Sequence, residues 1–414
     1  MSRNSTAASY LASAAFWLSG SSAVAILFSI AASQILLGLA FATLLMSGEK
    51  LRLPAIRLPL ALFMAGTLIS LALSGDASAG LPQIRKFFVF LMLLVVYSTF
   101  REVAQSRRLV LCWIAVGAVV AGRGLVQFWE KLRDARLLGQ DFYEYYVPER
   151  ITGFMGHWMT FGGELMIVML LLAAFLFFSP SARRKILWLC LLSGMLLLAA
   201  LLLSYTRAIW LATGAGALYL VWNWRRWLVL AAPVLLLAGV WLAPYSVRSR
   251  AISIFHPRKA TDSNQHRIVC WRTGWQMIRA HPWFGLGPEE VRIQFDRYIP
   301  PDVPRPLPNG WYGHLHNIYI HYAAERGVPT MLVLVWLLIK ILFDFLRTLR
   351  KLPPGPSDEK FLLYGSVAVV VAIMIAGVFE LNLGDSEVLT MFLATVACGY
   401  VARDSVMAKA ESAA

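Results

Sequence analysis

The sequence is poor in charged residues and in cysteine. Asp, Glu, Lys and Arg make up 15% of its 414 residues, whereas hydrophobic residues make up 58%. This composition excludes an ordinary soluble protein. The sequence offers no obvious pair of cysteines for a disulfide outside a membrane, because three of the four cysteines lie in apolar runs and only Cys270 lies in a polar segment. The sequence also lacks an internal repeat and a separate soluble domain.

Long apolar runs recur along the whole chain. A helix of about 20 apolar residues crosses the hydrocarbon core of a bilayer, and twelve runs approach that length: 10–28, 30–47, 58–74, 84–100, 109–128, 160–179, 186–203, 208–223, 227–243, 328–346, 361–380 and 386–402. No small-residue cleavage site follows the first run, which predicts a retained span. We therefore expect one all-α domain over residues 1–414, a polytopic transmembrane helical bundle with about 12 spans.

The positions of Lys and Arg predict the orientation. With a cytoplasmic N-terminus, every short inside loop is basic, and an even number of spans returns the C-terminus to the cytoplasm. Residues 244–315 (the large loop) then form one large periplasmic loop. The inside loops explain most of the net charge of +15, which attracts anionic membrane lipids. No nucleic-acid partner is expected.

Several cations lie on the outer side, where orientation gives no reason for them. They are Arg85 and Lys86 after an outer turn, Arg123 near the outer end of a span, Arg150 before another span, and Arg207 in the turn between two apolar runs. The large loop adds ten Lys or Arg against five acids. A charge at membrane depth costs roughly 2.5–3.5 kcal/mol, so it usually has a partner. The outer acids are too few, and we infer an anionic ligand.

Within the large loop, residues 261–264 (Thr-Asp-Ser-Asn) predict the start of a helix. Ile268, Trp271, Trp275 and Ile278 follow at a helical spacing and form one stripe. The plainer interpretation is an amphipathic helix on the bilayer, with Arg272 and Arg279 reaching the headgroups. The next segment, 281–288, contains Pro and Gly residues that require turns.

Histidines 314, 316 and 321 remain as candidates for chemistry. A zinc site is one interpretation, but His316 and His321 are five residues apart and no Cys or carboxylate is close in sequence, so we predict no metal site. A histidine held by a backbone hydrogen bond is the common alternative. The third role is a general base, for which an imidazole suits neutral pH.

The ordered set of motifs resembles the O-antigen ligase/polymerase superfamily of bacterial envelope glycosyltransferases, and within it the O-antigen ligases. The matching pieces are Ser204-Tyr205-Thr206-Arg207, Arg267 with Trp271, residues 281–287 (His-Pro-Trp-Phe-Gly-Leu-Gly), and His316-Asn317 leading to Glu325-Arg326-Gly327. The expected topology is similar too, and the resemblance covers roughly residues 80–400. Pro329-Thr330 departs from the family pattern. We expect this departure to alter how the helix after His316 enters the membrane.

The resemblance implies transfer of a glycan from undecaprenyl diphosphate to an acceptor without a cofactor, at the periplasmic face of the bacterial inner membrane in lipopolysaccharide biosynthesis. His316 is then the expected base, and Arg207 and Arg267 are expected to bind the diphosphate. Direct displacement predicts inversion at the anomeric carbon. The other expected substrate-binding residues are Arg85, Lys86, Arg123, Arg150, His314 and Asn317. No DxD-type carboxylate pair is present to hold a metal.

For a ligase the acceptor is lipid A–core oligosaccharide, whereas for an O-antigen polymerase it is another lipid-linked repeat unit. A flippase or exporter of lipid-linked glycans also requires an arginine-lined cavity. Such a protein does not need His316, and the two halves of its chain tend to be repeats with inverted topology. A membrane scaffold does not explain the outer cations. Lys340 and Asp344 are expected to neutralise each other, and Glu164 and Glu380 are given no catalytic role.

Overall fold

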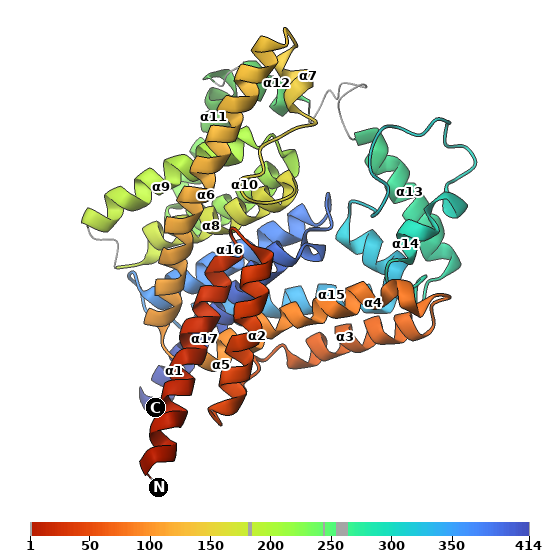
Figure 1. The fold of residues 1–414 in the computed structure, drawn as a ribbon. Helices are drawn as coiled ribbons and strands as arrows, with labels where there is room; N and C mark the ends of the chain where they lie inside the picture. Colours follow the sequence, from red (N-terminus) through yellow and green to blue (C-terminus); the bar gives the residue numbers. More distant parts are fainter. Residues whose placement is uncertain (1, 181–183, 243–244, 254–263, 414) are drawn as a thin grey trace.

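A computed structural model describes residues 2–180, 184–242, 245–253 and 264–413, and every regular element in these ranges is helical (Figure 1). The elements of the first half are α1 (Ser2–Ala25), α2 (Ile30–Met46), α3 (Arg57–Ala72), α4 (Ala77–Arg85), η1 (Lys86–Phe90), α5 (Leu91–Thr99), α6 (Val103–Leu137), α7 (Phe142–Tyr146), α8 (Trp158–Phe178) and α9 (Arg184–Leu203). The second half contains α10 (Arg207–Trp224), α11 (Arg226–Leu242), α12 (Tyr245–Ile252), α13 (Asn264–Ala280), α14 (Glu290–Ile293), η2 (Phe295–Tyr298), α15 (Ile318–Leu349), α16 (Asp358–Ala376), η3 (Asn382–Gly384) and α17 (Ser386–Ala413).

Each of the twelve predicted apolar runs lies on helical structure. Within the described ranges, six helical segments are long and apolar enough to cross a membrane: 77–99, 103–137, 158–178, 186–203, 318–349 and 358–376. Helices α2 and α3 are apolar but shorter. The protein is therefore a polytopic helical membrane protein, while the count of twelve spans and the cytoplasmic termini stay predictions.

Helices α8 and α16 form the centre of the bundle and pack against α10 and α17. Because lipid tails are as apolar as leucine, helices in a membrane associate by close packing, which small residues permit. Gly216 of α10 is such a residue, since a Cβ there would lie 3.0 Å from the carbonyl oxygen of Ala368 on α16. This close crossing holds the N-terminus of α10 in place, and that end carries Arg207.

Two smaller predictions can be checked in the bundle. On α15, Lys340 Nζ lies 2.7 Å from both carboxylate oxygens of Asp344, which confirms the predicted pair. Tyr400 of α17 also donates a hydrogen bond to Asp344. The four cysteines are free thiols, as their positions in the sequence suggested.

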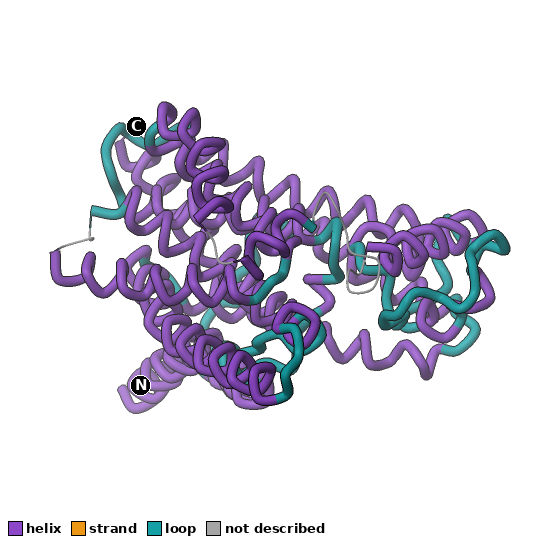
Figure 2. Tube along the Cα trace, turned by 90° about the horizontal axis from the view of Figure 1, so that it is seen from above, coloured by secondary structure: helices purple, strands orange, loops and turns teal. Residues whose placement is uncertain are grey.

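Residues 264–315 of the large loop pack as a small unit beside one end of the bundle, where Figure 1 shows α13 and α14 next to the ends of α3 and α4. Its core is apolar, contains Cys270, Met277 and Phe295, and continues into Ala323 and Ala324 of α15. Figure 2 shows this unit projecting to the right of the long helices. The loop is thus anchored on the first turns of α15, directly after His316.

Helix α13 begins at Asn264, and the predicted cap residues 261–263 lie outside the described residues. The predicted stripe is divided, since Ile268 and Trp275 are both 53% exposed, whereas Ile278 is buried in the apolar core and Trp271 packs against it. The buried face is built from smaller side chains, including Cys270 and Gly274, because Leu315 and Ile320 of the α15 region approach closely there. The exposed Ile268 and Trp275 fit the interpretation of a helix that contacts the bilayer.

The motifs at 281–287 and 325–327 form one backbone clamp. Leu286 N donates to Ala324 O and Gly287 N to Glu325 O, both at 2.9 Å, and Val328 N donates to Pro282 O at 2.8 Å. Gly327 has a φ of 84° and interrupts the helical backbone of α15, so the break precedes Pro329. The clamp fixes the direction in which the first part of α15 leaves the large loop.

Gly327→Ala is expected to destabilise the protein by about 1–3 kcal/mol, because a Cβ would overlap the carbonyl oxygen of Trp283 at a positive φ. Thermal unfolding of the purified protein measures this effect as a lower Tm. Gly122→Ala on α6 is the matched control, since a Cβ there has open space and the helix favours alanine. Equal Tm values for the two variants would contradict the clamp.

Candidate functional site

A cavity of about 630 Å³ opens where the large loop meets the bundle. Its wall is formed by the segments before α8 and α10, by α12 and α13, by residues 310–316, and by the turn 380–385. Among the described residues, the lining cations are Lys86, Arg150, Arg207, Arg250, Arg267 and Arg292, and the lining carboxylates are Glu289, Glu325, Glu380 and Asp385. Charge of both signs is therefore gathered in one concave site, as in many binding sites.

Two arginines of the cavity converge on the carbonyl of Tyr205. Arg250 Nε donates to this carbonyl oxygen at 3.0 Å, and Arg150 Nη1 lies 3.4 Å from it. Tyr205 itself has a φ of 50°, which is unusual for a residue with a side chain. Strained backbone of this kind clusters at functional sites, and here it aims a carbonyl at two guanidinium groups.

Arg207 joins the turn before α10 to the large loop. Its Nη1 donates to Ser253 O at 2.7 Å, and its Nη2 donates to Asn264 Oδ1, at the start of α13, at 2.8 Å. Arg267 lies one turn along α13 and also lines the cavity. The loop thus folds back over the turn, and Arg207 and Arg267 share the cavity although 60 residues separate them in sequence.

The arginines of this cluster repel one another. Burial is the main cause that lowers the pKa of Arg150, followed by the charges of Arg250 and Arg267 and then by that of Arg207. The guanidinium of Arg150 also lies 4.4 Å from the ring centroid of Trp158. Like charges held together in a partly buried site gain stability from an anion placed between them. This wall of the cavity is therefore suited to bind a polyanionic group.

His316 lies against Glu380, in the turn that follows α16. His316 Nδ1 is 3.2 Å from Glu380 Oε2, and His314 Nε2 is 3.2 Å from Glu380 Oε1. Arg267 Nη2 completes the group at 3.8 Å from Glu380. His316 has a φ of 47°, so the backbone turns sharply just before α15 begins. A carboxylate on Nδ1 orients an imidazole and stabilises its protonated form.

The charges of this group can be assigned. Burial acts to raise the pKa of Glu380, but the hydrogen bond and charge of His316, with those of His314 and Arg267, outweigh it and lower the pKa to about 2. Burial lowers the pKa of His314 to about 3, against the opposing charge of Glu380. Near neutral pH, Glu380 is therefore a carboxylate and His314 a neutral ring that donates to it.

The remaining predicted site residues divide into two groups. Lys86 lines the cavity, where its Nζ donates to Gly384 O at 3.0 Å. Arg85 and Arg123 are not among the lining residues, and Arg123 pairs with Glu130 at 3.5 Å. Asn317 caps α15 by accepting from two backbone N–H groups, and its amide donates to Val378 O, so its side chain is engaged in holding the fold.

Two residues of the site were missed from the sequence. Arg250 was counted only as one of ten loop cations, and Glu380 was given no catalytic role. The turn Asn382–Gly384 that follows Glu380 gave no sequence signal of its own. Glu380 stands at the end of the predicted apolar run 361–380, and 64 residues separate it from His316 in the sequence.

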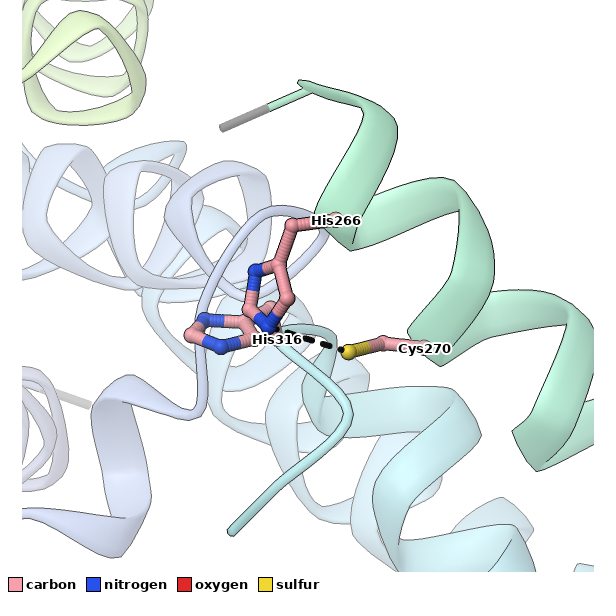
Figure 3. A group of neighbouring side chains, drawn as sticks. All are labelled: His266, Cys270 and His316. Atoms are coloured by element: carbon pink, nitrogen blue, oxygen red, sulfur yellow. Dashed lines mark hydrogen bonds between the residues drawn. The ribbon is translucent and has the colours of Figure 1, made fainter. Parts of the chain in front are cut away.

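The structure also groups side chains that can hold a metal. In the described part of the chain, these groups are His266, Cys270 and His316 (Figure 3), and His314, His316 and Glu380, each with ligand atoms within 4.8 Å of one another. His321 belongs to neither group, because its Nε2 faces Glu325 at 3.6 Å. Sequence distance concealed Cys270 and Glu380 as neighbours of His316.

Glu380→Gln is expected to lower kcat by at least roughly tenfold with little change in KM, because the amide keeps the shape but loses the charge that supports a protonated His316. Steady-state kinetics and a Tm measurement separate this positioning role from a structural one. Glu130→Gln is the control outside the cavity. A drop in Tm that accounts for the whole loss would contradict the role.

Comparison with known families adds an independent finding. Residues 192–335 match the family model described as O-antigen ligase. The matched segment contains Arg207, Arg267 and His316, whereas Arg150 and Glu380 lie outside it. No curated protein matches the chain.

Proposed function

Because this membrane protein belongs to the O-antigen ligase superfamily, with residues 192–335 as its matching domain, we propose that it transfers O-antigen polysaccharide from undecaprenyl diphosphate to lipid A–core oligosaccharide. The observation that carries the proposal is the single cavity that holds Arg207, Arg267 and His316. These three residues come from separate segments, and a buried carboxylate supports the histidine. A structural scaffold has no need for this arrangement.

The arginine cluster suits the diphosphate of the donor. Guanidinium groups form charge-assisted and often bidentate hydrogen bonds with phosphate oxygens. Arg207 and Arg267 bind the diphosphate, and Arg150 and Arg250 extend the same positive wall. When the anomeric C–O bond breaks, its electron pair leaves with the diphosphate, and these fixed cations stabilise the growing negative charge. The reaction thereby needs no metal to neutralise the leaving group.

His316 accepts the proton of the attacking acceptor hydroxyl. With Nδ1 directed at Glu380, Nε2 is the nitrogen for this task, and it lies 3.2 Å from Trp311 O. Two flanking acceptors are both satisfied only by a doubly protonated ring, which is the state after proton transfer. To act as a base, Nε2 must therefore exchange the Trp311 carbonyl for the acceptor hydroxyl. That oxygen attacks the anomeric carbon opposite the diphosphate, which inverts its configuration.

The acceptor and the location are part of the proposal. Trp275, Trp283 and Trp311 of the large loop are 53%, 69% and 61% exposed, and tryptophan prefers the headgroup level of a bilayer. Arg279 lies 5.4 Å from the ring centroid of Trp275 and offers a charge to phosphate. Such a surface suits a lipid acceptor with its own phosphates. We place the site at the periplasmic face of the inner membrane, in line with the basic inside loops.

Deletion of the gene distinguishes the ligase from an O-antigen polymerase, which shares the need for arginines and a histidine. The expected result is lipopolysaccharide with bare core, together with long polymers that remain on undecaprenyl diphosphate. Gel analysis of both lipid fractions, with a plasmid-borne copy as the control, measures this. Accumulation of core capped by a single repeat unit would identify the protein as the polymerase.

A further inference from the structure

Three soft or borderline metal ligands meet beside the cavity. His266 and Cys270 are four residues apart on α13 and project from the same face, toward His316 in the segment before α15 (Figure 3). The spacing of four places two ligands on successive turns of one helix, as in known zinc motifs. His266 and Cys270 are 3% and 0% exposed, so their positions are fixed by packing.

The separations of these atoms fit a tetrahedral ion. A zinc–sulfur bond of about 2.3 Å and a zinc–nitrogen bond of about 2.05 Å at a tetrahedral angle place the two ligand atoms roughly 3.6 Å apart. Cys270 Sγ and His266 Nε2 are 3.6 Å apart. All three ligand atoms lie within 4.8 Å of one another, so a small rotation of the His316 side chain brings its nitrogen into range. His266 and His316 both line the cavity, which provides an entry path.

The surroundings also fit a metal. Metal-bound imidazoles usually donate their other N–H to a carboxylate, which fixes the ring. His316 Nδ1 has this arrangement with Glu380, and Nε2 becomes the ligand nitrogen once it leaves the Trp311 carbonyl oxygen, which lies 3.2 Å from it. One thiolate and the nearby carboxylate of Glu380 offset the two charges of the ion. Mg²⁺ and Ca²⁺ prefer oxygen ligands, so the set selects Zn²⁺ over them.

We propose that His266, Cys270 and His316 form an inhibitory Zn²⁺ site. The inhibition rests on the proposed function, because the ion occupies the Nε2 lone pair that the acceptor hydroxyl needs, while the binding of the metal does not rest on it. On binding, Cys270 loses its thiol proton to solvent, and His316 Nε2 gives up its contact with the Trp311 carbonyl, together with any proton it carries, so that its lone pair binds the ion. Zinc thus acts as a reversible inhibitor, and a chelator removes the ion and restores activity.

The binding is tested with Co²⁺ and Zn²⁺ on the purified full-length protein. Wild-type protein is expected to bind one Co²⁺ with a thiolate-to-cobalt charge-transfer absorption that Zn²⁺ displaces. Cys270→Ser removes the absorption, and His266→Gln weakens Co²⁺ binding at least tenfold. Cys112→Ser is the matched control, since this cysteine is exposed on α6. No thiolate absorption in the wild-type protein, or an equal one in Cys270→Ser, would overturn the site.

The inhibition is tested with Zn²⁺ titrations of glycan transfer. The half-inhibitory Zn²⁺ concentration is expected to rise at least tenfold in Cys270→Ser and to stay unchanged in Cys112→Ser, while EDTA restores the wild-type rate and Mg²⁺ does not inhibit. Equal inhibition of the two variants, or zinc binding without inhibition, would overturn the proposal that zinc at this site inhibits transfer. Absence of transfer in metal-free protein would contradict the proposed function instead, and the cobalt absorption would still report on the site.

Discussion

Replacing His316 with alanine is expected to lower the rate of glycan transfer by roughly 10²–10⁴-fold, the contribution typical of a general base. The variant loses both the acceptor for the hydroxyl proton and the contact with Glu380. Its Tm and membrane insertion are expected to stay close to wild type, because the helix that follows begins at the Asn317 cap, which is untouched. Transfer assays on purified protein with matched amounts of folded enzyme give the comparison.

Three other histidines serve as controls for this result. His281 contacts Tyr298 away from the cavity lining, so His281→Ala is expected to keep its activity. His314→Ala and His321→Ala alter the lining and are expected to cost less than His316→Ala. Near-normal turnover of a well-folded His316→Ala protein would show that another group accepts the proton.

Arg207→Lys and Arg267→Lys are each expected to lower transfer by at least roughly tenfold, because an ammonium group cannot replace a planar guanidinium at a bidentate phosphate contact. Arg207 has the additional task of linking Ser253 and Asn264, which one lysine cannot bridge in the same way. Initial rates at varied donor concentration report the effect, which is expected in kcat/KM for the donor.

Arg123→Lys provides the matched control, since Arg123 pairs with Glu130 on α6 and does not line the cavity. Its activity is expected to equal that of the wild type. Comparable losses at Arg123 and Arg207 would mean that the substitutions act through overall charge and not through one diphosphate site.

The positions of the helices could be predicted from the sequence, because long apolar runs have few other solutions in a bilayer. The outer cations were also informative, since Lys86, Arg150, Arg207 and Arg267 all line the cavity. Arg85 and Arg123 do not line it, although their sequence signal was the same. A cation near a membrane surface can contact lipid or an acid, and only the fold decides between these partners.

Contacts between segments that are distant in the sequence could not be predicted from it. Glu380 reaches His316 through the turn after α16, and Cys270 reaches it through α13. The buried face of α13 was predicted only at Ile278, because its Cys and Gly residues carry less apolar area than the exposed Ile268 and Trp275. Close packing against α15 selected the small residues, whereas hydrophobic periodicity counts only the large ones.

The two glycine-containing motifs illustrate the same limit. Gly285 lies in a segment that predicted turns, and Gly327 lies in a motif of the family resemblance, but neither signal reveals that the two segments are partners. The structure joins them by hydrogen bonds between residues 286–287 and 324–325, and both glycines have positive φ values. Their role is to set the path of α15 after His316, which is a task of positioning and not of chemistry.

Reconstitution of the purified protein with an undecaprenyl diphosphate-linked glycan and lipid A–core tests the central claim most directly. We predict transfer to lipid A–core in the presence of EDTA, with the opposite anomeric configuration in the product. The Arg207, Arg267 and His316 group supplies the charge and the base for this reaction. Loss of transfer on chelation that a divalent ion restores, or retention of the anomeric configuration, would contradict the account.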